Sequence, residues 1–511
     1  MSKDFHIAII GAGLSGIQLG DAFGSQGYRY TVFEKASQVG GTWRDNTYPG
    51  LFIDVLTRNY EYKHARGSGW KRRFAAGSEI QDYLVDFARK KGVVKNTKFG
   101  VEIVSTEWVN GKWELKDISG RKYHADAVVA ATGFLRVPTV PNFEGKGTFR
   151  GPAFHSSEWD HSVNMQGKRI GVIGTGSSGV QIVSEMGKRG NEVTHFIRTP
   201  QWMMVRENPE ISVWEKLLLK IPGTGKYVDR YKAKLFAKIE GPPSWRFEPG
   251  PERIRVQEQY RRELERLIPD PVLREKLTPK DEPGSKRIAK TQDYYKVVQR
   301  SNVHVSVGGI QRIEADGIVD AEGVKHELDV IVYATGFDAH AYMRPMQITG
   351  PDGITMDDVW KDGVFSYYGV GVPGMPNLFL ACGPYAPINL VPIPSLVEDE
   401  LQLINRLLAL SSREGVALAP TMEATNRFLD EIQAAIPRTT FAKGPNWYTD
   451  KTGRQIIWPW NRDEHALRLK NASLDDFARF PTHKNWAGAP AIHPAPARGE
   501  PGMPGTVTAQ G

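Results

Sequence analysis

The chain has 511 residues, enough for two or three domains with substantial cores. Its hydrophobic content of 40% and charged content of 24% are those of an ordinary globular protein, and its mild net charge of +8 argues against a nucleic-acid-binding surface. The single cysteine, Cys382, excludes an internal disulfide, a C-x-x-C redox pair and a cysteine zinc site.

The first strand is expected from about Phe5 and a glycine-rich loop from Gly11, which leaves no room for a secretory signal. No run approaches the ~18 consecutive apolar residues of a membrane span. The 12 histidines form no H-E-x-x-H motif or tight pair, so no metal site is expected. We therefore expect a cytoplasmic protein with no membrane span and no metal ion.

The chain contains a diverged internal repeat of two units. Each unit opens with an apolar strand and continues through a glycine-rich loop, a helix and a second strand. The two units end in segments of similar amino-acid sequence. The opening strands are His6–Ile10 and Arg169–Ile173, the loops run from Gly11 to Gly16 and from Gly174 to Gly179, and the closing segments are Asp126–Phe134 and Asp329–Phe337. Alternating strands and helices predict an α/β fold with two Rossmann-like dinucleotide-binding domains, each with a parallel sheet.

The spacing of the repeat predicts the domain boundaries. From its first glycine to its closing threonine the second unit spans 161 residues and the first unit 121, so we place the extra residues in a helical insertion at about 205–282. The chain should then return to the first domain through a strand at 378–380 and a helix within 396–410. This division assigns residues 1–140 and 341–480 to the first domain, 141–165 to a linker, 166–340 to the second domain and 481–511 to an extended or disordered tail.

Each glycine loop lies between a strand and a helix, where the backbone can approach a pyrophosphate and the helix N-terminus supplies NH groups. The end of the next strand discriminates between dinucleotides. Glu34 can accept hydrogen bonds from both ribose hydroxyls, as with FAD or NAD, whereas the guanidinium of Arg198 suits a 2′-phosphate. We interpret the first site as an FAD site and the second as an NADPH site; the alternative for Arg198 is a solvated charge at a strand end.

The loops and strand ends give two sets of candidate cofactor-binding residues. The FAD set is Gly11, Gly13, Ser15, Gly16, Glu34, Lys35, Thr132 and Gly133. The NADPH set is Gly174, Gly176, Ser177, Ser178, Gly179, Gln181, Arg198, Thr199, Thr335 and Gly336.

Two longer patterns carry a family resemblance. The segment 149–160 between the two units has the form F-x-G-x-x-x-H-x-x-x-W-D, and residues 40–54 match [AG]-G-x-W-x(4)-[FY]-P-[GM]-x(3)-D at every specified position. The chain resembles the type I Baeyer–Villiger monooxygenases, flavin enzymes that insert one oxygen atom beside a ketone carbonyl. The resemblance covers about residues 5–460 and implies the two-domain flavoprotein fold. The chain departs from the family at the bulky segment 51–53, where small residues or a cysteine are usual.

The resemblance implies roles for individual residues. Gly41, Thr42 and Trp43 would lie against the flavin, and Asp54 would orient Arg287, whose guanidinium would stabilise the negative charge of the reaction. A helix cap or a turn residue is the alternative for Asp54. Lys286 would help to bind the 2′-phosphate of NADPH. The fingerprint residues of the linker are Phe149, Gly151, His155, Trp159 and Asp160, and His155 is expected to couple the domains rather than to transfer protons.

The implied activity is NADPH- and dioxygen-dependent conversion of a small-molecule ketone to an ester or lactone through an FAD peroxide. Oxidation of sulfur or nitrogen through a hydroperoxyflavin and a non-catalytic dinucleotide sensor remain as alternatives, whereas the lack of C-x-x-C excludes a disulfide reductase. The expected substrate walls are residues 51–53, 385–394, 447–448 and 458–460.

Overall fold

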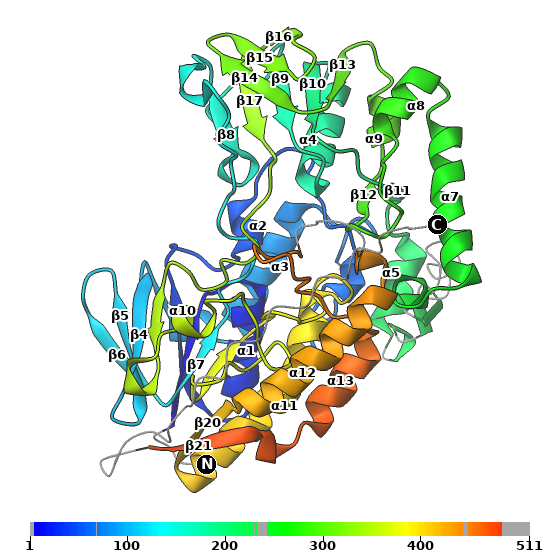
Figure 1. Cartoon of the computed structure of the whole chain (residues 1–511). Coiled ribbons are helices and arrows are strands. Elements are labelled where there is room, and N and C mark those ends of the chain that lie inside the picture. The colour runs from blue at the N-terminus through cyan, green and yellow to red at the C-terminus, as the bar shows by residue number, and fades with distance from the viewer. Residues whose placement is uncertain are drawn as a thin grey trace, which may run out of the picture.

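The computed structural model describes residues 5–67, 69–221, 223–225, 227, 228, 230, 231, 243–442 and 448–482. Trp447 and all of the expected tail beyond residue 482 lie outside these residues. Two lobes make up the described chain, each built around a parallel five-stranded sheet (Figure 1).

The first sheet combines strands from both halves of the chain in the order β19-β7-β1-β2-β3, and all of its pairings are parallel. The strands are β1 (His6–Ile10), β2 (Arg29–Glu34), β3 (Thr97–Phe99), β7 (Ala127–Ala130) and β19 (Leu378–Leu380). The expected return of the chain at residues 378–380 is therefore confirmed. In β1, Ile7, Ala8 and Ile9 have no exposed surface, as expected for a parallel strand that is covered on both faces.

The second sheet has the order β13-β10-β9-β17-β8 and is also parallel throughout. Its strands are β8 (Ala153–His155), β9 (Arg169–Ile173), β10 (Glu192–Ile197), β13 (Val303–Val307) and β17 (Val330–Tyr333). Strand β8 comes from the expected linker, so part of the family fingerprint forms the edge of this sheet. The two repeat units thus each form a sheet with its glycine loop after the central strand.

Smaller sheets flank these two. They are formed by β4 (Ile103–Val109), β5 (Lys112–Asp117), β6 (Lys122–Ala125) and β18 (Gln347–Thr349); by β14 (Ile310–Glu314), β15 (Gly317–Asp320) and β16 (Lys325–Glu327); by β11 (Met203–Val205) and β12 (Ala289–Thr291); and by β20 (Val416–Pro420) and β21 (Phe477–Pro481).

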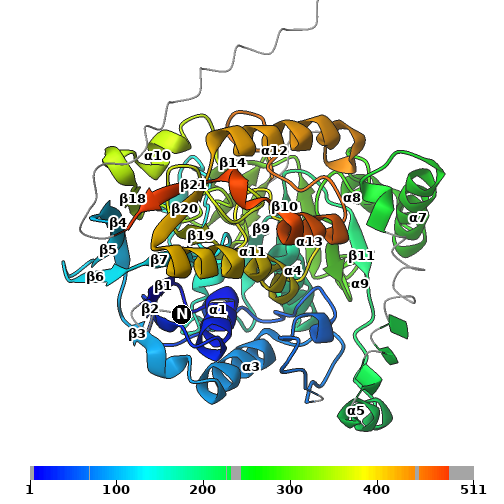
Figure 2. The same ribbon diagram turned by 90° about the horizontal axis from the view of Figure 1, so that it is seen from below.

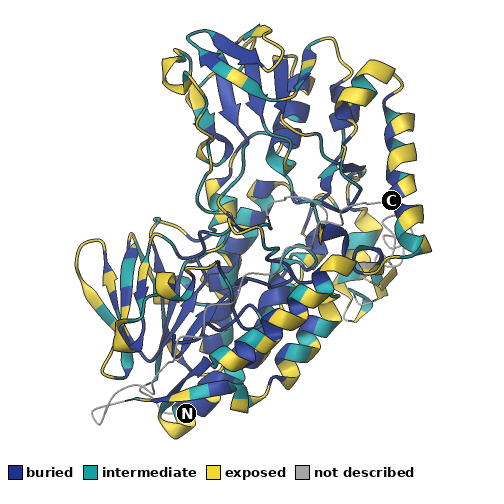
Figure 3. Cartoon of the chain, viewed as in Figure 1, coloured by how far each residue is buried: buried dark blue, intermediate teal, exposed yellow. Residues whose placement is uncertain are grey.

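The longer helices of both lobes bury apolar residues on one side (Figure 3). In the first lobe they are α1 (Leu14–Ser25), α2 (Thr42–Asp45), α3 (Gly77–Lys90), α10 (Met356–Val359), α11 (Ile393–Glu414), α12 (Met422–Ala435) and α13 (Arg462–Asn471). Helix α11 contains the apolar spacing recognised in the sequence, buries Leu396, Ile404 and Leu407, and packs against α1. In the second lobe α4 (Ser177–Lys188) follows the glycine loop and α9 (Tyr294–Val297) packs on it.

The described part of the range 205–282 is largely helical. It contains α5 (Val213–Lys220), α7 (Pro251–Leu267) and α8 (Pro271–Leu277). Helix α7 buries Val256, Tyr260 and Leu264 in the core of the second lobe. Helix α5 lies at the periphery, away from both parallel sheets (Figure 2).

No helix among the described residues is long and apolar enough to cross a bilayer. Within the same residues, no group of three or more histidine, cysteine, aspartate or glutamate side chains could hold a metal ion.

Candidate active site

The two glycine loops have the same geometry. Gly11 and Gly174 adopt φ values of +105° and +116°, which L-residues with side chains rarely adopt. A Cβ on Gly16 would lie 1.9 Å from the Gly11 carbonyl oxygen, and a Cβ on Gly179 would lie 2.0 Å from that of Gly174. Only glycine allows the helix to start this close to the loop, so both loops form open backbone cradles in front of a helix N-terminus.

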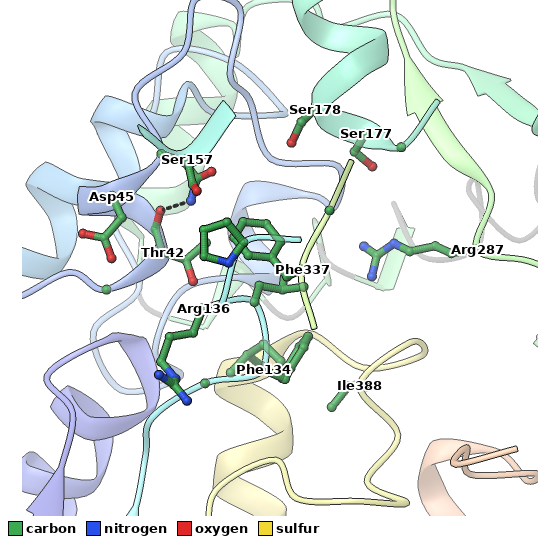
Figure 4. A pocket seen from close by; sticks show the side chains of 18 of the residues that line it. Thr42, Asp45, Phe134, Arg136, Ser157, Ser177, Ser178, Arg287, Phe337 and Ile388 are labelled. Carbon is green, nitrogen blue, oxygen red and sulfur yellow. Dashed lines mark hydrogen bonds between the residues drawn. The ribbon is translucent and has the colours of Figure 1, made fainter. Parts of the chain in front are cut away.

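Both cradles open on one continuous cavity of ≈ 2440 Å³ between the two lobes. This volume exceeds the roughly 300–1,000 Å³ of a usual small-molecule pocket, which fits a site for more than one ligand. Among the predicted cofactor-binding residues only Gly16 and Gly179 do not line the cavity. Figure 4 shows Ser177, Ser178 and Arg287 of the second lobe facing the same space as Phe134 and Ile388 of the first lobe.

The first cradle ends at the carboxylate of Glu34, which is buried at the end of β2. Its Oε2 accepts a hydrogen bond from the backbone NH of Ala12 at 2.8 Å, and its Oε1 accepts one from Ala36 at 2.9 Å. The guanidinium of Arg44 lies 3.1 Å from the same Oε1. Glu34 therefore ties the glycine loop to the strand end while it lines the cavity.

The second cradle is fixed by a buried histidine that the sequence analysis did not identify. His195 on β10 has no exposed surface; its Nε2 lies 2.9 Å from the Gly174 carbonyl oxygen and its Nδ1 2.8 Å from the Tyr294 hydroxyl. Because Gly174 offers only an acceptor, Nε2 carries the proton and Nδ1 accepts from Tyr294. Burial lowers the pKa of His195 from its usual 6.5 to about 4, so the ring is neutral. Arg198 and Thr199, just beyond the end of β10, line the cavity.

Asp54 and Arg287 form an ion pair across the cavity, although 233 positions separate them in the chain. The Arg287 Nη2 donates to Asp54 Oδ2 at 2.8 Å. The side chain of Asp54 is 16% exposed and that of Arg287 is 39% exposed towards the cavity. The guanidinium is thus held at one end and open to a ligand at the other.

The pair reinforces the charge of both partners. Attraction to Asp54 raises the pKa of Arg287, against the opposing effect of burial. Burial alone would raise the pKa of Asp54, but Arg287 and then Lys290 outweigh it and leave that pKa below its usual value. Both groups are therefore charged at neutral pH.

Lys286 lines the cavity beside Arg287 and forms an ion pair with Asp281. The exposed fractions of the two side chains are 28% and 35%. The ammonium group is therefore held at the rim of the second cradle, where it can still reach an anionic ligand.

The fingerprint residues of the linker lie outside the cavity lining. His155 is buried at the end of β8, with its Nε2 3.0 Å from the Gly336 carbonyl oxygen and its Nδ1 accepting from the Ser157 backbone NH at 3.2 Å. Burial lowers the pKa of His155, and the two contacts fix the Nε2-protonated tautomer. His155 therefore holds the closing segment of the second unit and contacts no reacting group.

The other fingerprint residues stabilise the linker by packing and turns. The Trp159 ring packs edge-on against Phe154 at 5.3 Å, and a Cβ on Gly151 would lie 2.4 Å from the Asp329 carbonyl oxygen. Phe149 packs against the small core beside the second sheet, and Asp160 accepts two hydrogen bonds from Ser162 in an exposed turn.

A hydrogen-bonded bridge joins the 40–54 segment to helix α4. The Tyr48 hydroxyl donates to Gln181 Oε1 at 3.0 Å, and Gln181 Nε2 donates to the Phe52 carbonyl oxygen at 3.0 Å. Tyr48 and Gln181 are both buried. Gln181 thus connects the first residues after the second glycine loop to the segment that carries Asp54.

Two further polar residues line the cavity: Tyr60 was not identified from the sequence, whereas Asn389 lies in the expected substrate wall 385–394. Tyr60 accepts a hydrogen bond from Trp43 Nε1 at 3.1 Å, and burial raises its pKa. Asn389 lines the cavity, and both polar atoms of its amide are buried without a partner among the described residues. Tyr60 belongs to no motif, so only the three-dimensional structure brings it to the site.

The expected substrate walls are present in part. Residues 51–53, 388–393 and Tyr448 line the cavity. Trp458 and Trp460 do not: Trp458 is fully buried, packs edge-on against Trp460 at 4.9 Å and donates from Nε1 to the Asn461 carbonyl oxygen. That part of the expectation is wrong, because the two tryptophans pack on each other and on α13.

Comparisons with known proteins agree with this architecture. Residues 4–221 match the family described as flavin-binding monooxygenase-like. An uncharacterized monooxygenase of Mycobacterium tuberculosis is 38% identical over 475 residues, which are 92% of this chain and 95% of that protein. A Baeyer–Villiger monooxygenase of Streptomyces coelicolor is 32% identical over 484 residues, 92% of each chain.

A solved structure has the same fold over nearly its whole length. The crystal structure of OTEMO in complex with FAD and NADP superposes with a TM-score of 0.85 at 26% identity and covers 94% of this chain and 100% of that one. The two parallel sheets, the shared cavity and the large share of the chain that these matches cover all indicate the same family. The chain belongs to the Baeyer–Villiger monooxygenases, within the flavin-binding monooxygenases.

Proposed function

We propose that this protein is an NADPH- and dioxygen-dependent Baeyer–Villiger monooxygenase that converts ketones to esters or lactones. The observation that carries the proposal is the Asp54–Arg287 ion pair in the cavity between two dinucleotide cradles. It supplies a fixed cation, half open to the cavity, where negative charge must be stabilised.

The cradles fit two different cofactors. We propose that FAD is held by the first glycine loop, Glu34 and Lys35, the Gly41–Trp43 turn and the Thr132–Gly133 pair. We propose that NADPH is held by the second glycine loop, Ser177 and Ser178, Arg198 and Thr199, Lys286 and the Thr335–Gly336 pair. Bound together, the two cofactors supply a hydride and the means to activate dioxygen.

The residues of the chain provide electrostatics and orientation. Arg287 remains protonated at every working pH and stabilises the negative charge that develops on the ketone oxygen when its carbonyl is attacked. Asp54 fixes the direction of the guanidinium through the 2.8 Å contact. Such preorganised donors commonly contribute about 10²–10³ in rate.

The division of the chain follows from the same assignment. We propose that residues 1–140 and 341–480 form the FAD domain, that 166–340 form the NADPH domain with its helical insertion, and that 141–165 link them. The linker is supported by His155, which bonds to the Gly336 carbonyl oxygen. We also propose a cytoplasmic location, for which the single buried cysteine offers support.

The test is product analysis with isotopically labelled dioxygen. The purified, FAD-loaded enzyme is given NADPH, ¹⁸O₂ and a panel of linear, cyclic and aryl ketones. One ¹⁸O atom in the ester for each NADPH consumed supports the proposal. NADPH consumption with hydrogen peroxide and no ester from any ketone contradicts it.

A further inference from the structure

Helix α5 carries an apolar stripe that faces solvent. Trp214, Leu217, Leu218 and Ile221 follow the i, i+3, i+4, i+7 spacing of a single helix face, which in a globular protein normally packs on the core. Here all four are between 43% and 80% exposed, and α5 buries no residue fully. We call these four residues the α5 stripe.

The exposure is concentrated in this part of the chain. Among the described residues fourteen large hydrophobic side chains are exposed, and seven of them lie within 213–231. The three besides the stripe are Val213, Tyr227 and Tyr231, each at least 69% exposed. Scattered apolar residues need no explanation, but half of the total within nineteen positions indicates an interaction surface.

The same segment is basic. Its described residues between 213 and 231 include Lys216, Lys220 and Arg230 against one acidic residue, Glu215, a net charge of +2. On α5 itself, Lys216 and Lys220 are one turn apart and lie off the stripe. An apolar face with tryptophan and leucine, flanked by lysines, is the pattern of a helix that lies in the surface of an anionic bilayer.

The charge also argues against two other occupants. A second copy that covered the α5 stripe would bury the apolar side chains but leave Lys216 and Lys220, which lie off the stripe, without an anionic partner. A nucleic acid would satisfy the lysines but leave the stripe in contact with water. An anionic lipid surface satisfies both.

From the α5 stripe and its lysines we infer that this protein binds peripherally to anionic membranes through helix α5. The inference concerns binding to lipid and does not depend on the reaction that the cavity performs.

The experiment is vesicle co-sedimentation of the FAD-loaded, full-length enzyme. Vesicles of phosphatidylcholine with 30% phosphatidylglycerol are compared with vesicles of phosphatidylcholine alone, at low and high salt. We expect binding to the anionic vesicles that weakens at high salt, because the Debye length falls to about 3 Å at 1 M.

Two variants separate the apolar and the charged contributions. Trp214→Ser/Leu217→Ser should weaken binding at least about tenfold, since it removes two side chains that would enter the bilayer. Lys216→Glu/Lys220→Glu should weaken binding to anionic vesicles by about fivefold or more for each residue and should abolish the salt dependence. The matched control is Ile254→Ser/Val272→Ser, which removes exposed apolar side chains from α7 and α8 and should bind as the wild type does.

Three results would overturn the inference. The first is no binding of the wild type to 30% anionic vesicles at low salt. The second is equal binding by the wild type and both α5 variants. The third is self-association of the wild type in light scattering that Trp214→Ser/Leu217→Ser abolishes, which would assign the α5 stripe to a second copy. Retained flavin absorbance and NADPH oxidation show that each variant is folded.

Discussion

The two dinucleotide cradles share one backbone design but are fixed by opposite chemistry. In the first, the carboxylate of Glu34 accepts hydrogen bonds from the loop at Ala12 and from Ala36. In the second, neutral imidazoles bond to the backbone: His195 to the Gly174 carbonyl oxygen and His155 to that of Gly336. The first cradle is thus tied by an acceptor and the second by donors.

The difference follows from what each strand end must recognise. A carboxylate that accepts from ribose hydroxyls can also accept from backbone NH groups. In the second unit the strand is followed by Arg198, whose guanidinium can accept no hydrogen bond, so the loop is fixed by other groups. The second cradle is therefore sensitive to pH, because the buried imidazole of His195 must stay neutral to accept a hydrogen bond from Tyr294.

The largest effect should come from the residue that connects the two cradles. Arg287 belongs to the second unit, yet its partner Asp54 belongs to the first. Arg287→Ala should lower the rate of ester formation by about 10²–10³ while NADPH still reduces the bound flavin, because the lost interaction acts on developing charge. Turnover of a ketone with separate measurement of ester and hydrogen peroxide checks this.

The control is Arg246→Ala. Arg246 also lines the cavity, but its guanidinium lies 4.8 Å over the Trp245 ring rather than beside Asp54. The Arg246→Ala variant should form ester at a rate close to that of the wild type. A near-native ester rate for Arg287→Ala would remove the assigned role.

The second prediction concerns Arg198 and the preference of the enzyme for NADPH over NADH. Arg198→Gln should raise the KM for NADPH by about 10–100-fold and leave the KM for NADH nearly unchanged, since it removes a charge-assisted contact to a phosphate that NADH lacks. Steady-state kinetics with both coenzymes measures the ratio.

Glu34→Gln is the reciprocal variant. It should weaken retention of FAD on dialysis without changing the preference for NADPH over NADH. Equal coenzyme preference in Arg198→Gln and the wild type would indicate that Arg198 is a solvated strand-end charge.

The parts of this molecule that could be predicted are those encoded by local pattern. The glycine loops, the strand ends at Glu34 and Arg198 and the opening strands each depend on neighbours within a few residues. The Asp54–Arg287 ion pair joins residues 233 positions apart. It could be predicted only because the family resemblance links the two sequence segments that carry these residues.

Contacts without a motif could not be predicted. His195 is one apolar-facing histidine in a buried strand, and its bond to Gly174 depends on the register of β9 and β10. Trp458 and Trp460 are expected in the substrate wall, but they pack on each other, because aromatic pairs occur in cores as readily as in cavities. Tyr60 reaches the cavity through a loop conformation that no periodicity encodes.

The third prediction concerns pH. With the pKa of His195 lowered from 6.5 to about 4, the unfolded chain binds a proton at pH 5.5 that the folded protein does not. Stability should therefore fall as the pH drops from about 6.5 towards 4, by about 1 kcal/mol between pH 8 and pH 5.5 for this residue. Urea denaturation at the two pH values measures it.

The variant His195→Gln sharpens this test. A glutamine amide can still donate to the Gly174 carbonyl oxygen but does not titrate, so the loss of stability between pH 8 and pH 5.5 should shrink by that amount. His465, whose pKa burial also lowers to about 4, keeps its own share of the loss in both proteins. Tyr294→Phe retains the buried imidazole and should keep the full loss; an unchanged loss in His195→Gln would contradict the assignment.

The smallest effect should come from the bridge between the 40–54 segment and α4. Tyr48→Phe removes only the hydroxyl that donates to Gln181, and a buried neutral hydrogen bond contributes about 0.5–1.5 kcal/mol. In a double-mutant cycle with Gln181→Leu, the coupling energy from urea denaturation should be about 1 kcal/mol. The same pair joins the segment that carries Asp54 to the helix that follows the second glycine loop, so a real coupling should also raise the KM for NADPH in both single variants. Additive losses of stability, with no change in that KM, would mean that the two cradles are held together by Arg287 and Asp54 without help from this bridge.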